Sequence, residues 1–367
     1  MVRNSRRAAG RPPLTRLTRL ERALVAAVAA VTVAAGIARY AHGLSQVLAF
    51  VLATLSLAGL AWIVSFATEQ AGRHFGPAIT GVMQSTLGNL PEFFVVIFAL
   101  GAGQLIVAET ALFGSILVNA LLVLGLVLIV GARRERDGIM RFSKRLPNDT
   151  ATLMLISTFI IILIALTHSS ADAASHHAKA ISIVGAAAIL VVYATWLRGY
   201  LRSDTGPGEA IGPPRLATSA SAVLLITAAT ASAFVSDWFI HALTPTIHTL
   251  HISKAFAGLV IVAIAGNAVE NVAGVVLAMK GRSELAISVV KNSVAQIAAF
   301  LYPLLVLVSV LTATTLTFSI APVYAGALFG TAVIVWQITG DGEATAFEGA
   351  ALIAAFVILA TVAAFES

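Results

Sequence analysis

The chain has 367 residues, of which 59% are hydrophobic and 11% charged, and its formal net charge is +6. Ordinary globular domains are roughly 45–50% apolar and about 25% charged, so this composition excludes a soluble protein and predicts an all-α polytopic membrane protein. The absence of cysteine excludes disulfides, cysteine-ligated metals and thiol nucleophiles.

Long uncharged runs predict the membrane-spanning helices. Crossing ~30 Å of hydrocarbon takes about 20 mostly apolar residues in a helix, and these runs are too long and uniformly apolar for barrel strands. The segment 237–253, which contains Pro245, is expected to lie along the outer surface. Cutting the runs at glycine, proline and polar clusters predicts about eleven helices, near residues 23–40, 45–68, 76–101, 105–131, 150–168, 179–201, 215–236, 254–280, 284–310, 319–337 and 344–365.

The basic residues predict the orientation of these helices. Seven arginines precede the first helix, and alternate loops on the same side carry most of the remaining lysines and arginines. The positive-inside rule therefore predicts a cytoplasmic N-terminus and an external C-terminus, in the cell (inner) membrane. The basic tail is expected to contact membrane lipid and no nucleic acid. A cleaved signal peptide is an alternative interpretation of the first helix.

Six histidines fall in two predicted external loops, where they are expected to be solvated, although a metal site or a pH sensor is an alternative. They are His168, His176, His177, His241, His248 and His251.

Two motifs at membrane depth repeat along the chain. Residues 88–92 read Gly-Asn-Leu-Pro-Glu, and residues 266–270 read Gly-Asn-Ala-Val-Glu. Each glutamate is followed at the same distance by a serine, Ser115 after Glu92 and Ser293 after Glu270. An amide follows about one turn later in each case, at Asn119 and at Gln296.

The two motifs lie in the third and the eighth predicted helices, and an odd offset of five means that these two helices run in opposite directions through the membrane. This is the inverted-repeat plan of secondary transporters, whose site lies at the midplane. The predicted organisation is a basic cytoplasmic tail, a first transmembrane helix, a five-helix repeat, a cytoplasmic linker and a second five-helix repeat, at residues 1–22, 23–43, 44–202, 203–214 and 215–367.

The paired glutamates predict a site for a hard cation. A carboxylate at the centre of a membrane helix costs roughly 2.5–3.5 kcal/mol on insertion scales, which argues for a function. Glu92 and Glu270, with nearby amide, hydroxyl and carbonyl oxygens, supply the ligands that calcium prefers. When the cation leaves, two facing carboxylates would take up protons, because like charges disfavour ionisation. Helix-to-helix hydrogen bonding is the structural alternative.

These motifs resemble the cation/proton exchanger (CAX) branch of the calcium:cation antiporter superfamily. The resemblance covers roughly residues 45–365 and includes the Gly114–Gly125 stretch, the Ser293–Pro303 stretch and the segment from Asp341 to Gly349. It implies a lone first helix plus two inverted five-helix repeats, and export of calcium in exchange for protons. By resemblance, Glu92 and Glu270 would bind calcium and protons, with auxiliary oxygens from Asn89, Asn267, Ser115, Asn119, Ser293 and Gln296.

Several positions depart from the family pattern. Pro91 is closer to the sodium/calcium exchanger relatives, and Asn271 stands where many proton-coupled members have histidine. Lys291 adds a positive charge within a predicted span, and its stem is expected to reach the interface, an ion pair with Glu270 or Glu92 being the alternative. Candidates of second rank are Gly88, Gly266, Lys291, Glu348 and Glu69.

Calcium/proton antiport is therefore the leading prediction, with sodium-coupled or monovalent cation/proton exchange as its rival. A passive cation channel is the alternative of a different class. No metalloprotease or phosphate-binding motif is present, so an enzyme is not expected, and no cofactor is expected beyond the transported ions. The sequence leaves the oligomeric state open.

Overall fold

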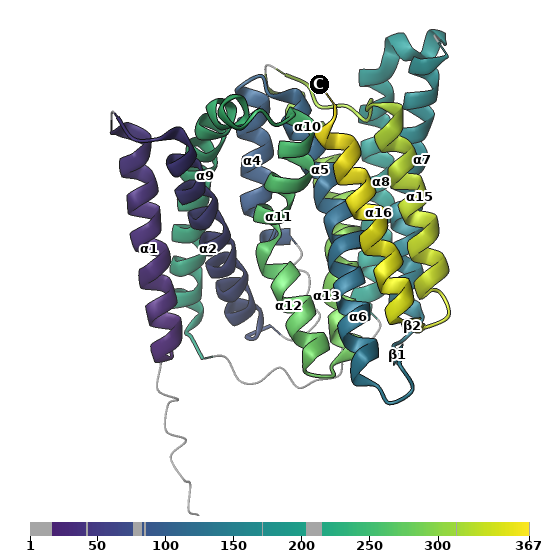
Figure 1. Ribbon diagram of the computed structural model, residues 1–367, viewed down its shortest axis with the longest axis horizontal. Helices are drawn as coiled ribbons and strands as arrows, with labels where there is room; N and C mark the ends of the chain where they lie inside the picture. The colour runs from purple at the N-terminus through teal and green to yellow at the C-terminus, as the bar shows by residue number, and fades with distance from the viewer. Residues whose placement is uncertain are drawn as a thin grey trace, which may run out of the picture.

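Apolar helices build the whole bundle, because backbone groups in lipid have to be hydrogen-bonded within their own segment (Figure 1). The structure is a computed structural model that describes residues 17–41, 43–75, 83, 86–170, 172–202, 215–312 and 314–366. In this part of the chain, nine helices are long and apolar enough to cross a membrane, and a bent pair forms a further span. The all-α membrane fold is confirmed, and the predicted count of eleven stays approximate.

The first helix and the first repeat contain the elements up to residue 202. They are α1 (Arg19–Tyr40), α2 (Gln46–Gly72), α4 (Leu90–Gly101), α5 (Leu105–Leu117), the π-helical η1 (Val118–Val123), α6 (Leu124–Arg134), β1 (Ile139–Arg141), α7 (Arg145–Ser169), the 3-10 helix η2 (Ala173–His177) and α8 (Ala178–Arg202). Residues 76–82 and 84–85 of the predicted third span lie outside the described residues, as do residues 1–16 of the tail and the predicted linker 203–214.

The second repeat contains the elements from residue 215 onward. Its elements are α9 (Thr218–Leu250), α10 (Lys254–Phe256), the π-helical η3 (Ala257–Val262), α11 (Ala263–Gly266), α12 (Ala268–Met279), α13 (Ser283–Gln296), the π-helical η4 (Ile297–Leu301), α14 (Tyr302–Ser309), α15 (Pro322–Thr339), β2 (Glu343–Thr345) and α16 (Ala346–Ala364).

We call the end of the bundle where α1 begins the tail side, and the opposite end the far side. The tail side is at the bottom of Figure 1, and the C-terminus is on the far side, at the top. Thr18 and Glu21 start α1 with a capping box, and Thr345 and Glu348 start α16 in the same way.

The helix predicted to end at residue 236 is longer than expected, because α9 continues through Pro245 to Leu250. The segment predicted to lie along the outer surface is therefore, up to Leu250, the C-terminal part of α9. Proline lacks the backbone N–H that would donate to the carbonyl of His241 one turn earlier, whereas the carbonyl of Pro245 accepts a hydrogen bond from the Thr249 hydroxyl at 2.9 Å. Continuing the helix keeps the other backbone groups paired, which the hydrocarbon environment requires.

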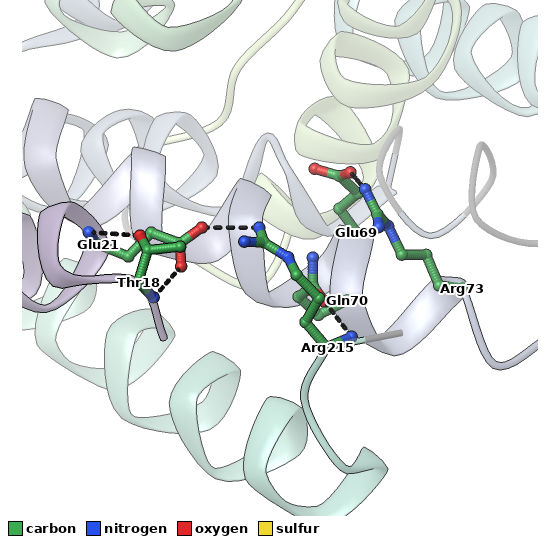
Figure 2. Close-up of polar contacts among 6 residues, drawn as sticks. All are labelled: Thr18, Glu21, Glu69, Gln70, Arg73 and Arg215. Carbon is green, nitrogen blue, oxygen red and sulfur yellow. Dashed lines mark hydrogen bonds and ion pairs between the residues drawn. The ribbon is translucent and has the colours of Figure 1, made fainter. Parts of the chain in front are cut away.

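The first helix is attached to both repeats on the tail side (Figure 2). Glu21 accepts a hydrogen bond from the Arg215 guanidinium at 2.7 Å. The backbone N–H of Arg215 donates to Gln70 of α2 at 3.0 Å, and Glu69 forms an ion pair with Arg73 one turn along. Arg215 lies just before α9, so one arginine joins α1, α2 and the start of the second repeat.

A short antiparallel ladder joins the two repeats on the same side. β1 pairs with β2 so that Met140 faces Ala344 and Arg141 faces Glu343. Arg141 also forms ion pairs with Asp137 at 2.8 Å and with Glu343 at 3.2 Å. The hydrogen bond from Arg141 lowers the pKa of Asp137, because it stabilises the charged carboxylate. We call residues 137–144 and 340–345 the tail-side clasp.

Candidate cation site

Both repeated motifs lie where a helix is interrupted. Asn267 has φ −105° and ψ 17° and separates α11 from α12, which bend by 62° at this point. Asn89 precedes the first residue of α4, and Pro91 occupies its first turn. Glu92 and Glu270 therefore each lie in the first turn of a helix that begins within the membrane-depth motif. The partial positive charge of a helix N-terminus favours a carboxylate or a bound anion at this position.

Polar side chains of the two repeats are in direct contact between these helix breaks. Asn119 on η1 donates from Nδ2 to Oδ1 of Asn267 at 3.2 Å. Asn267 in turn donates from Nδ2 to Ser115 Oγ at 2.8 Å. All three side chains are buried. The sequence spacing predicted these residues as one group, and the structure places them together.

Glu92 is buried beside this cluster without a hydrogen bond to either carboxylate oxygen from the described residues. Its carboxylate is within electrostatic range of Ser115, Glu270 and Asn267. Glu270 is half-buried. Glu92 belongs to the first repeat and Glu270 to the second, and the charge of Glu270 acts on Glu92.

Several buried oxygen atoms near the helix breaks are unused as hydrogen-bonding groups within the described chain. They are Glu92 Oε1, Glu92 Oε2, Asn119 Oδ1 and Ser293 Oγ. A buried polar atom without a partner costs free energy, and unused oxygens are the ligands that hard cations take. Among the described residues, no three histidine, aspartate or glutamate side chains gather as a metal-binding group. The candidate donors are therefore carboxylate oxygens and neutral oxygens.

The other predicted oxygen donors lie on the same helices. Asn89 is buried and directly precedes α4, and Gln296 is half-buried at the end of α13. A π-helical segment lies at each of the two amides that follow the motif serines: η1 includes Asn119, and η4 begins directly after Gln296. Such wide turns are frequent at functional sites, because they redirect side chains within a helix.

Two glycines set the distance between the helices that carry the site. A Cβ atom at Gly114 of α5 would lie 2.3 Å from the carbonyl oxygen of Leu259 on η3. A Cβ atom at Gly258 of η3 would lie 2.0 Å from Thr110 Oγ1 on α5. Ser115 directly follows Gly114, so this close crossing of α5 and η3 keeps Ser115 within reach of Asn267.

We expect Gly114→Ala to destabilise the protein and to reduce transport. The added methyl group would meet backbone atoms of Leu259, which cannot move aside as a flexible side chain can, and overpacking of this kind costs about 1–3 kcal/mol. The thermal unfolding midpoint of the purified protein and its ion uptake measure the two effects. Gly326→Ala on α15 is the control, because nothing lies within 4 Å of the added carbon. Equal midpoints for the two variants would contradict the close crossing.

Lys291 reaches toward the tail-side end of α15, and the alternative of an ion pair with Glu270 or Glu92 is not found among the described residues. Its side chain is buried, with 1% of its surface exposed, and Nζ donates to Thr339 Oγ1 on α15 at 2.9 Å. None of the ion pairs in the described part of the chain involves Lys291. Lys291 precedes Ser293 by two residues, which places it on a different face of α13, toward α15.

The remaining second-rank candidates have structural roles or no contact with the cluster. Glu348 accepts hydrogen bonds from the backbone and hydroxyl of Thr345 and completes the capping box of α16. Glu69 pairs with Arg73 at the tail side. Gly88 and Gly266 directly precede the two motif asparagines, and a Cβ atom at Gly266 would meet open space. All six histidines predicted to lie in external loops are exposed, although His241 and His248 are part of α9 and not of a loop.

Two buried polar groups were not among the predicted ligands. Asn271 Oδ1 and Asn292 Oδ1 are also buried without a hydrogen-bond donor from the described residues. Asn271 directly follows Glu270 and Asn292 directly precedes Ser293, in runs with almost no charged residues. These positions are the signal by which the sequence could have identified the two asparagines as candidate ligands. Thr339 carries no such signal, because a single threonine near the end of an apolar helix is common.

Broken helices from two inverted repeats that bring acidic and amide side chains together define a membrane transporter of the secondary type. The chain also matches the family model of the sodium/calcium exchanger protein over residues 45–199 and 220–365, and it belongs to this family. The resemblance to cation/proton exchangers is thereby confirmed, and the family consists of transporters.

Curated relatives and solved structures agree with this assignment. The chain is 32% identical over 327 residues to a vacuolar calcium ion transporter of Schizosaccharomyces pombe, covering 84% of this chain and 77% of that protein. It is 29% identical to the Ca2+/H+ antiporter ChaA of Bacillus subtilis, covering 89% of this chain and 96% of that protein. The structure of native YfkE matches with a TM-score of 0.77 and 25% identity, covering 94% of this chain and 99% of that one. The structure of the H+/Ca2+ exchanger CAX matches with a TM-score of 0.76 and 17% identity, covering 93% and 88% of the two chains.

Proposed function

We propose that this protein exports calcium from the cytoplasm in exchange for protons, by alternating access to a site between Glu92 and Glu270. The observation that carries the proposal is the set of buried oxygens without hydrogen-bond partners, which come from Glu92 and Asn119 of the first repeat and from Ser293 of the second. The names of its relatives, which include Ca2+/H+ antiporters and vacuolar cation/proton exchangers, support calcium and protons as the two exchanged ions.

The charges of the site support exchange of a divalent cation for protons. Two carboxylates balance one calcium ion, and the neutral oxygens of Asn119 and Ser293 complete its coordination without adding charge. Without the cation, the two acids have only each other and neutral groups around them, and proton uptake removes their repulsion. Competition between calcium and protons for the same oxygens couples the two movements. Lys291 lies on a different face of α13 and is hydrogen-bonded to Thr339, which weakens the argument for a monovalent cation.

We also propose that the tail side is cytoplasmic and that the protein resides in the cell membrane. The described loops on the tail side carry many lysines and arginines, including Arg73, Arg133, Arg134, Arg136, Arg141, Lys144, Arg215, Lys280 and Arg282. The positive-inside rule associates such loops with the cytoplasm. Calcium would then be expelled toward the far side.

Uptake by inside-out membrane vesicles tests this function. With an acidic lumen and no sodium, the vesicles are expected to accumulate calcium and to release it when a protonophore collapses the pH gradient. Vesicles from cells without the protein are the control. Uptake that requires a sodium gradient would instead favour sodium-coupled exchange, and a current that flows without any exchanged ion would favour a channel.

A further inference from the structure

A second polar cavity lies on the far side of the bundle, separate from the site described above. It has a volume of about 510 Å³ and is lined by residues of α1, α2, α9 and the turn between α1 and α2. The residues that carry its chemistry are Arg39, Tyr40, Gln46, Trp238 and His241. None of the predicted cation ligands lines it. The mechanism proposed for ion exchange makes no use of these side chains.

Arg39 is the centre of this cavity and lacks an acceptor for one of its donors. Its Nε atom is buried without a hydrogen-bond partner among the described residues, and its guanidinium lies over the ring of Tyr40, with Cζ 5.2 Å from the ring centre. None of the ion pairs in the described chain involves Arg39. Because a guanidinium offers five donors and cannot lose its charge, a buried unused N–H calls for an anionic acceptor.

The other groups around the cavity favour the same sign of ligand. Gln46 is the first residue of α2, and the side chain of Ser45 before it forms no capping hydrogen bond. The first backbone N–H groups of a long helix are a favourable position for phosphate. Trp238 and His241 add ring N–H groups, and no aspartate or glutamate is among the lining residues.

The surroundings of the cavity indicate a lipid as the source of the anion. Ile37, Leu44 and Leu48 are exposed beside it, and apolar side chains at this position can contact acyl chains. The cavity lies at the ends of membrane-spanning helices, where headgroups are located, and tyrosine and tryptophan are enriched at that depth. A phospholipid whose phosphate reaches Arg39 would have its acyl chains against α1 and α2.

We propose that this cavity binds the phosphate of an anionic phospholipid headgroup, held by Arg39 with Trp238, His241 and the N-terminus of α2. The lipid would fill the space where α1 packs on the first helices of the two repeats. Arginine suits this role because its planar fork makes charge-assisted hydrogen bonds to phosphate oxygens.

Native mass spectrometry with added phosphatidylglycerol tests the proposal on the full-length protein in detergent. Wild type is expected to retain the lipid, and Arg39→Ala is expected to bind it at least about tenfold more weakly, because a charge-assisted hydrogen bond is lost. Arg39→Lys is expected to fall between the two. Lys254→Ala removes an exposed charge from the same side and serves as the matched control.

Two further measurements keep the result decisive. If Arg39→Ala does not fold, His241→Ala changes an exposed side chain of the same cavity and is expected to weaken retention several-fold. Retention equal to wild type in the folded variants would overturn the proposal. Displacement of phosphatidylglycerol by an equal concentration of inorganic phosphate would also overturn it, because the site would then take free phosphate. Neither readout depends on ion transport, so failure here is distinct from failure of the proposed antiport.

Discussion

Glu92→Gln is expected to abolish calcium binding and at the same time to raise the thermal stability of the calcium-free protein. Both oxygens of Glu92 are buried without hydrogen-bond donors, so the carboxylate is costly to the fold and available to a cation. Glutamine preserves the shape but removes one of two balancing charges and turns a donor group toward the cation. The loss of affinity is expected to be at least about a hundredfold, or ~3 kcal/mol.

Calcium titration calorimetry and thermal unfolding of the purified variant measure the two effects together. Glu109→Gln is the control, because Glu109 is also a glutamate within a membrane span but lies on α5 one to two turns before Ser115. Wild-type calcium affinity in Glu92→Gln would remove Glu92 from the site. A lower unfolding midpoint in the absence of calcium would indicate that the carboxylate stabilises the helices by hydrogen bonds.

Thr339→Val is expected to be among the most destabilising single changes outside the cation site. It leaves the buried ammonium of Lys291 without its hydrogen-bond acceptor, and a hydrogen bond to a charged group contributes about 1.5–3 kcal/mol. Lys291→Met removes the charge itself and should cost much less, because the replacement of a buried polar pair by apolar groups is often nearly neutral. The double variant is expected to recover most of the stability lost in Thr339→Val.

Unfolding midpoints of the two single variants and the double variant form a cycle that isolates this interaction. The ion selectivity and pH dependence of transport are expected to stay at wild-type values in Lys291→Met, since Lys291 and Ser293 lie on different faces of α13. Altered selectivity would return Lys291 to the cation site and weaken the assignment of Thr339 as its partner.

The composition and the motifs predicted the fold class and the approximate spans, because both depend on local properties of the chain. The helix interruptions at Asn89 and Asn267 were not predicted, because both motifs lie inside long apolar runs that predict the single helices 76–101 and 254–280. The equal spacing from each glutamate to its serine placed Ser115 in the correct group.

Other features depend on how distant helices pack and were therefore not predictable from one sequence. The contact between Asn119 and Asn267 requires the close crossing at Gly114, which involves residues far apart in the chain. The contact of Lys291 with Thr339 was not predicted, because the position of Lys291 along α13 was known but the neighbour on that face was not. The helix was predicted to end at residue 236, although α9 continues through Pro245 to Leu250.

The tail-side clasp has a consequence for how the chain is assembled. It pairs residues that are about 200 positions apart, Arg141 with Glu343, and the repeats also meet at Gly125 and Gly349, where a Cβ on either glycine would lie 2.6 Å from the carbonyl oxygen of the other. The two repeats are therefore connected by these contacts as well as by the peptide chain through residues 203–214. Separately synthesised fragments ending at residue 202 and starting at residue 215 have the complementary surfaces needed to find each other in the bilayer and reconstitute the intact bundle.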